Sequence, residues 1–198
     1  MGTAIIVIIA IIGVLVLWLI GVYNKLVSLR NQVKNAWSQI DVQLQRRYDL
    51  IPNLIETVKG YMTYEKGTLE AVINARNTAS AARQAVEKSG GPTGEGSIKD
   101  LLAAESTLKS TLGNFFALAE NYPQLKASEP MQRLQEELSS TENKIAFARQ
   151  AYNDQAMNYN TSQQVFPAVL IASVFGHHPA DLYEIQDVEA KKAVKVAF

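Results

Sequence analysis

Two adjacent histidines, His177 and His178, are the residues of this sequence most suited by type to bind a metal ion. Asp181 and Glu184 follow them closely and carry carboxylate oxygens. However, one helix or loop cannot easily direct two neighbouring imidazole rings at the same ion, and the chain has no cysteine to supply a thiolate. The sequence therefore predicts no metal site, and it indicates no cofactor.

Paired carboxylates are the second kind of group that could do chemistry, as general acid and base. Glu136 with Glu137 and Glu65 with Glu70 are such pairs, but each stands on a polar helix face where a solvated surface is expected. The absence of cysteine excludes a thiol nucleophile and disulfides. No glycine-rich phosphate-binding loop follows a strand. We therefore expect a protein that is not an enzyme.

A third set of polar residues is compatible with two interpretations. Glu142 and Arg149 are seven positions apart and so share one helical face. These side chains could line a ligand pocket, or they could form salt bridges and hydrogen bonds that fix the register between helices. We favour the structural network. The candidate residues are Arg46, Arg47, Asp49, Asn53, Arg76, Glu142, Arg149, Tyr152 and Asn153.

Pro52 interrupts the amphipathic stretch RRYDLIPNLIETVKGY, residues 46–61. Proline lacks the N–H that would bond the carbonyl four residues earlier, and its ring crowds that carbonyl. A helix can begin or bend there, and Asp49 is placed to cap amides freed at such a start. The apolar stripe keeps its phase on both sides of Pro52, which favours a kink over a reversal.

The elements that carry these residues begin with a membrane span. Ala4 to Val22 are uncharged and almost wholly apolar, and as a helix they reach roughly 28 Å, close to the thickness of the hydrocarbon core. Trp18 and Tyr23 near one end suit the membrane interface. A cleaved signal peptide would need a basic start, a shorter apolar run and a small-residue cleavage site, none of which is present.

Flanking charge predicts the orientation of this span. Lys25, Arg30 and Lys34 follow it and no basic side chain precedes it, so the C-terminal side is expected in the cytoplasm, with residues 1–3 as a short external tail. Over the whole chain 19 basic residues balance 19 acidic ones. That balance gives no support for a nucleic-acid partner.

Apolar residues at steps of three and four predict an all-α domain over residues 23–176, an antiparallel bundle of long helices with a coiled-coil-like stripe. One helix is expected to continue from the span to about Leu50. Further segments are expected at 53–88, 98–120 and 131–164. The loop SGGPTGEGS, residues 89–97, separates the second from the third, and residues 177–198 are expected to be a polar tail.

Several motifs along the chain resemble the LemA family of bacteria. They are RRYDLIPNLIETVKGYMTYE, ARNTA, AENYPQLKAS, LQEELSSTENKIAFARQAYNDQAMNYNT, the FP and FG of QQVFPAVLIASVFG, and the final VKVAF. The match covers nearly the whole chain, although His177 and His178 replace the aromatic and basic residues that commonly follow FG. The resemblance implies an N-terminal anchor in the bacterial inner membrane, a helical bundle, no established enzymatic activity, and by analogy a role in organising membrane.

We therefore expect a membrane-anchored scaffold that forms a homo-oligomer through its long helices and acts on the lipid bilayer or on other membrane proteins. The alternative hypothesis is a monomeric adaptor that recruits or regulates another membrane protein, such as a protease. Binding of a small ligand inside the bundle also stays open.

Overall fold

The computed structural model describes residues 2–93 and 98–184, and within these ranges the chain is helical and has no β-strand. The prediction of an all-α protein is confirmed. The elements, in chain order, are α1 (Gly2–Val58), α2 (Lys66–Lys88), a short 3-10 helix η1 (Gly91–Thr93), α3 (Lys99–Ala119), α4 (Pro123–Lys126), α5 (Glu129–Gln164) and α6 (Ala168–Val174).

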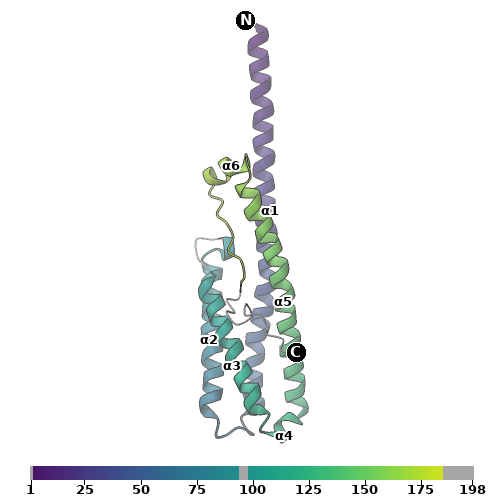
Figure 1. The fold of residues 1–198 in the computed structure, drawn as a ribbon, viewed down its shortest axis with the longest axis vertical. Coiled ribbons are helices and arrows are strands. Elements are labelled where there is room, and N and C mark those ends of the chain that lie inside the picture. The colour runs from purple at the N-terminus through teal and green to yellow at the C-terminus, as the bar shows by residue number, and fades with distance from the viewer. Residues whose placement is uncertain (1, 94–97, 185–198) are drawn as a thin grey trace, which may run out of the picture.

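Helix α1 has two halves of different character. Its 57 residues reach roughly 85 Å. The N-terminal half projects alone, and its most apolar window has a mean hydropathy of 3.3 with no residue buried, which fits a membrane anchor (Figure 1). From Leu26 onward one stripe of α1 is buried in the bundle: Leu29, Val33, Trp37, Ile40, Leu44, Tyr48, Ile51 and Leu54.

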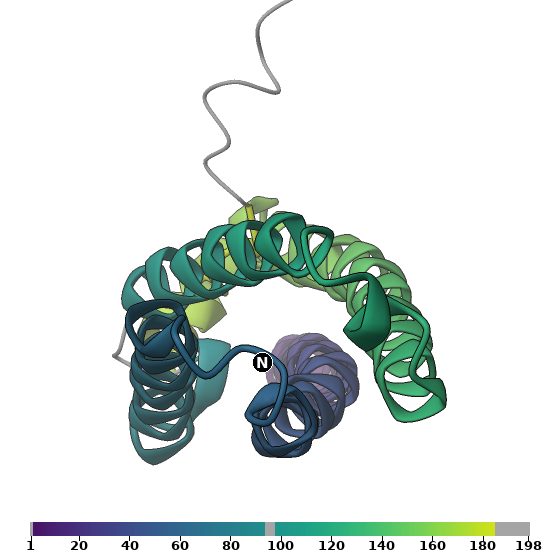
Figure 2. The ribbon, with the colours of Figure 1, turned by 90° about the horizontal axis from the view of Figure 1, so that it is seen from below.

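Four long helices pack in alternating directions. The C-terminal half of α1 runs away from the span, α2 returns, α3 descends and α5 returns along α1 (Figure 1). Seen end-on, α2, α3 and α5 form an arc, and α1 occupies its open side against α2 and α5 (Figure 2). Each helix buries a stripe spaced by three or four residues, which is the pattern of an antiparallel bundle.

The predicted helix over residues 53–88 is wrong, because the chain reverses inside it. Helix α1 passes Pro52 and ends at Val58, and α2 begins at Lys66. The connection contains Gly60, a poor helix former. Met62 within it is fully buried. Since Met62 continues the apolar spacing of Val58, periodicity alone does not reveal the turn.

The ends of the later helices lie close to their predicted positions. Helix α3 begins one residue after Ile98, and α5 ends at Gln164. Ser128 caps α5, since its hydroxyl accepts a hydrogen bond from the amide of Met131 at 3.4 Å, and Pro130 occupies the first turn. Helix α6 then packs against α1 through Ile171 and Ala172.

Candidate functional site

A buried arginine joins three helices at the centre of the bundle. Arg47 of α1 is 5% exposed, and its guanidinium contacts Glu105 of α3 on one side. On the other side its Nη1 lies 2.5 Å from Oε2 of Glu142 on α5. Two carboxylates from separate helices therefore share one cation, which is the pairing that a buried charge requires.

Tyr48, the neighbour of Arg47, extends this cluster. Its side chain is fully buried, and its hydroxyl donates to Oε1 of Glu105. Burial raises the pKa of Tyr48 to about 12, so the hydroxyl keeps its proton and acts as a donor at neutral pH. We refer to Arg47, Tyr48, Glu105 and Glu142 as the central cluster.

Pro52 and Arg76 meet at a single backbone carbonyl. Because Pro52 has no N–H, the carbonyl of Tyr48 four residues earlier lacks its helical partner. Nε of Arg76 on α2 donates to this carbonyl oxygen at 3.1 Å. The break in the hydrogen-bond ladder of α1 is therefore filled from the neighbouring helix, and α1 continues beyond the proline.

Further ion pairs surround the central cluster. Nη1 of Arg83 on α2 contacts both carboxylate oxygens of Asp41 on α1, at 2.7 and 2.8 Å. Nζ of Lys109 lies 3.3 Å from Glu142 Oε1. Arg46, which is exposed, approaches Glu137 at 3.6 Å. The Arg46–Glu137 and Lys109–Glu142 pairs are largely exposed and contribute little to stability, whereas the Arg83–Asp41 pair is partly buried and joins α1 to α2 as a second charged contact beside Arg47.

A small cavity of about 110 Å³ adjoins the central cluster. Arg149, Lys109, Ser106 and Tyr183 line it together with Arg47, Glu105 and Glu142. Sites for small organic ligands are usually about 300 Å³ or larger. A cavity of this size and polarity suits a few water molecules between charged groups.

A short C-terminal segment, Ala180 to Tyr183, is held along α5 by two asparagines, and we call it the strap. The side chain of Asn153 donates to the Tyr183 carbonyl at 3.2 Å and accepts from the Tyr183 amide at 2.8 Å. Asn160 makes the same pair of bonds with Ala180, both at 2.8 Å. Seven residues separate the two asparagines, so both lie on one face of α5.

The strap also contacts the rest of the bundle. The hydroxyl of Tyr152 donates to the Asp181 carbonyl at 2.5 Å, and a carboxylate oxygen of Asp181 accepts from the amide of Ile98 at 3.3 Å. Ala180 and Tyr183 are buried. Burial raises the pKa of Tyr183 to about 12 and also raises the pKa of Tyr152. Residues 177–184, expected in a polar tail, therefore pack into the bundle, and residues 185–198 of that tail lie outside the described residues.

The sequence-predicted site residues lie in three places: the centre of the bundle, the strap and the outer side of α1. Arg76 and Glu142 take part in the contacts at the centre, and Arg149 lines the adjoining cavity. Tyr152 and Asn153 hold the strap.

Arg46, Asp49 and Asn53 lie on the outer side of α1. Because the helix does not begin at Pro52, Asp49 caps no helix start, and it accepts a hydrogen bond from Gln45 at 2.7 Å.

Sequence reasoning missed Glu105, Tyr48, Asn160 and Tyr183. Glu105 has a recognisable signal, since it stands on the apolar stripe of α3 with Leu101, Leu108 and Leu112. Tyr48 likewise continues the stripe of Leu44 and Ile51 on α1. A charged or polar residue within an apolar stripe indicates a buried partner.

Of the two histidines, His177 packs into the protein and His178 is exposed. Nδ1 of the buried His177 lies 2.9 Å from the hydroxyl of Tyr159. Burial, with the charge of Arg30 and His178, lowers the pKa of His177. Among residues 2–93 and 98–184, no three His, Asp or Glu side chains are grouped as metal ligands.

Comparison with known proteins identifies similar chains. The model of the LemA family matches residues 36–198. Magnetosome protein MamQ of Magnetospirillum gryphiswaldense is 26% identical over an alignment of 173 residues, and the match covers 78% of this chain and 61% of the relative. Magnetosome protein MamQ 2 of Paramagnetospirillum magneticum is 25% identical over an alignment of 177 residues, and the match covers 82% of this chain and 64% of the relative.

A third relative is covered over more of its length. Protein LemA of Metamycoplasma hominis is 24% identical over 178 residues, 90% of this chain and 76% of the relative. The chain therefore spans less than two thirds of the magnetosome relatives that it matches and most of the mycoplasma relative.

Proposed function

The chain belongs to the LemA family, and from this membership we propose that it is a non-enzymatic, membrane-anchored scaffold that self-associates and organises membrane or membrane proteins. The coarser part of this statement, a membrane-associated protein of the LemA type, follows from the family and the apolar helix. The arguments below concern self-association and the role as a scaffold.

The continuity of α1 is the observation that carries the proposal. One helix forms both the candidate span and a wall of the bundle, and it passes Pro52 without a break. A flexible linker would let a domain turn freely beneath its anchor, whereas a continuous helix transmits the position of the span to the bundle. Such a rigid unit is suited to forming regular contacts between neighbouring copies in one membrane.

The polar centre supports a structural role for the network. In the central cluster the cation is paired with both carboxylates, Glu142 also pairs with Lys109, and the adjoining cavity of about 110 Å³ is small. Arg76 completes the backbone of α1 through Nε and donates from Nη1 to Asn77 Oδ1 at 3.2 Å. We therefore assign these groups to holding α1, α2, α3 and α5 in register.

Individual exposed apolar side chains on the long helices are candidate points of contact between copies. Phe147 on α5 is 74% exposed, and Met157 on the same helix and Val42 on α1 are also exposed. Covering such a side chain between two copies removes apolar surface from water, which is favourable. The names of two relatives, magnetosome proteins, are consistent with a role at a membrane compartment.

Disulfide cross-linking in native membranes tests self-association directly, because the chain has no cysteine of its own. A Phe147→Cys variant is expected to form a covalent dimer under mild oxidation. A Glu87→Cys variant, on the exposed side of α2, serves as a matched control and should remain mostly monomeric. Absence of a dimer from Phe147→Cys, with no dimer after a bismaleimide reagent either, contradicts self-association through α5 and favours the adaptor.

We further propose that the bundle lies in the cytoplasm, because Lys25, Arg30 and Lys34 follow the span. Single cysteines at Gly2 and Tyr64 test this orientation, since both positions are exposed. Gly2 begins the span, and Tyr64 lies in the connection between α1 and α2, after the end of α1 that is remote from the span. A membrane-impermeant maleimide added to intact cells should label Gly2→Cys alone. Labelling of Tyr64→Cys from outside reverses the orientation.

A further inference from the structure

The turn after α5 and helix α6 carry a cluster of exposed apolar side chains. Phe166 is 80% exposed, Val174 78% and Leu170 62%, and Val165, Val169 and Phe175 are also exposed. No charged side chain occurs between Gln164 and His177. We call residues 165–175 the apolar turn.

The apolar turn lies where α1 leaves the bundle toward its N-terminus (Figure 1). Ile171 and Ala172 of α6 pack against Leu26 and Val22 of α1. Val22 is the last residue of the apolar run of α1, so α6 stands at the axial level where the span ends. The exposed side chains are thus adjacent to the surface of any membrane that α1 crosses.

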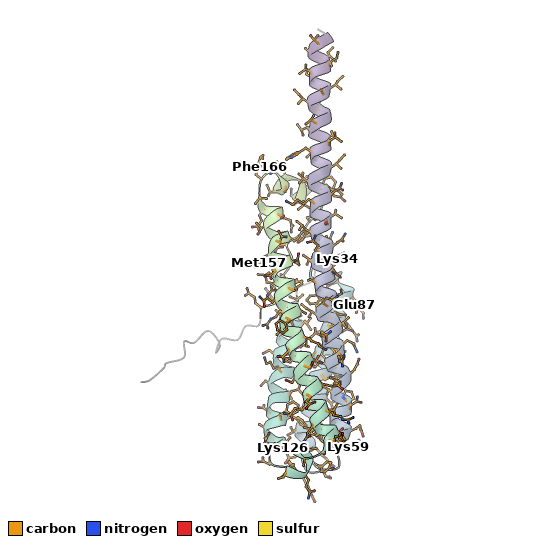
Figure 3. The ribbon with its side chains drawn as sticks, turned by 90° about the vertical axis from the view of Figure 1, so that its right-hand side faces the viewer. Lys34, Lys59, Glu87, Lys126, Met157 and Phe166 are labelled. Carbon is orange, nitrogen blue, oxygen red and sulfur yellow. The ribbon has the colours of Figure 1, made fainter. Side chains whose placement is uncertain are left out.

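An aromatic contact joins the two elements at this level. The ring centroids of Tyr23 and Phe175 are 5.0 Å apart. Tyrosine at the end of a span prefers the membrane interface. In Figure 3, Phe166 lies at the end of the bundle from which the span projects, beyond Met157 along α5.

The length of the segment favours insertion at the interface. An apolar run of about ten to fourteen residues is too short to cross a bilayer and is typical of a buried core helix or of an interfacial segment. The exposure of Phe166, Leu170 and Val174 excludes a core role for their side chains. The exposed polar residues Gln164 and His178 flank the segment, which suits a boundary between lipid and water.

We propose that the apolar turn inserts into the lipid interface beside α1 and is a second membrane contact of this protein. The partner is the bilayer that α1 crosses. Two contacts hold the bundle at a fixed rotation and height relative to the membrane, which one helix passing through lipid does not achieve. A single copy makes this contact, so it does not depend on self-association.

Depth-dependent quenching in proteoliposomes tests the insertion. The full-length chain with one cysteine at Leu170, labelled with the environment-sensitive dye NBD, is reconstituted in phosphatidylcholine–phosphatidylglycerol vesicles with or without nitroxide groups on the acyl chains. A Phe166→Cys variant repeats the test at an independent position. Phe147→Cys is the matched control, because Phe147 is also exposed but lies about 28 Å from Phe166 along the axis of α5, away from the proposed membrane contact.

Insertion predicts blue-shifted NBD emission at positions 170 and 166 and a large loss of that emission with nitroxide lipid. The Phe147→Cys dye should lose none of its emission. Water-like emission at both test positions, unaffected by nitroxide lipid, overturns the proposal. Emission that is blue-shifted only at high protein density, without quenching by lipid, also overturns it, since a second copy then covers the surface.

Discussion

The contact between Arg76 and the backbone freed by Pro52 yields a quantitative prediction. Nε of Arg76 donates to the carbonyl of Tyr48 at 3.1 Å. A hydrogen bond from a charged group contributes about 1.5–3 kcal/mol when partly buried, and loss of the donor leaves the carbonyl without a partner. We expect Arg76→Ala to lower the free energy of unfolding by about 1.5–2 kcal/mol.

Replacing the proline should make the arginine partly dispensable. In a Pro52→Ala variant, residue 52 regains an N–H that can bond the Tyr48 carbonyl within α1. In this background Arg76→Ala should lower the free energy of unfolding by at least about 1 kcal/mol less than it does when Pro52 is present. A coupling energy of this size is typical of groups in contact. The hydrogen bond from Arg76 to Asn77 exists in both backgrounds and cancels from the comparison.

Urea unfolding of the full-length protein in mild detergent measures these four free energies. Trp37 is buried in the bundle and packs against Tyr152, so its emission reports bundle unfolding. Replacing Trp18 by Phe in every variant leaves Trp37 as the one tryptophan. Arg133→Ala is the matched control, because Arg133 forms an exposed pair with Glu129 and should not couple to Pro52. An Arg76→Ala cost that is equal in both backgrounds refutes this account of how α1 passes the proline.

Three further predictions concern the central cluster and the strap. Arg47→Met removes the cation that Glu105 and Glu142 share, so it should destabilise the bundle by about 3–5 kcal/mol. Adding Glu105→Gln and Glu142→Gln to this variant removes the unpaired charges and should recover part of the lost stability. Urea unfolding midpoints measure both effects, and no recovery argues against charge as the cause. Burial raises the pKa of Tyr48 and Tyr183 from 10 to about 12, so the folded state favours the neutral form of both side chains. The stability that this provides is complete below pH 10. Between pH 10 and 12 the free energy of unfolding should fall by about 1.4 kcal/mol per pH unit for each tyrosine. Unfolding at a series of pH values checks this. Tyr48→Phe should remove the contribution of Tyr48, while those of Tyr183 and of Tyr152, whose pKa is also raised by burial, remain; an unchanged slope contradicts the prediction. Asn153→Ala should accelerate hydrogen exchange at the Tyr183 amide several-fold, in line with about 1 kcal/mol for the lost hydrogen bonds. The control variant Asn143→Ala, on the exposed side of α5, should leave this exchange rate unchanged. Equal protection of the amide in both variants means that Asn153 does not hold the strap.

The sequence is sufficient to predict most of the helical architecture, because apolar spacing and turn residues report burial locally. Ser128 and Pro130 mark the start of α5, and the glycines of residues 89–97 mark the end of α2. The reversal at residues 59–65 was not predicted from the sequence, because Met62 extends the apolar spacing across the turn. Periodicity reports which side chains are buried and not whether the axis of the helix continues.

The candidate site was harder to predict, because its contacts join residues distant in sequence. Arg46 and Arg47 are neighbours of the same type, yet the direction of each Cβ makes one exposed and the other buried. Glu105 becomes a partner of Arg47 only when α3 is placed beside α1. The strap depends on Asn153 and Asn160 bonding to backbone groups, and backbone groups have no sequence signature.

The mass of the full-length particle, extracted in mild detergent, tests the central claim of self-association most directly. Light scattering corrected for bound detergent gives the number of 21.8 kDa chains in each particle. A scaffold predicts one defined assembly of several chains that persists on dilution. A particle of one chain, obtained in several detergents and matched by an absence of cross-links in native membranes, contradicts self-association.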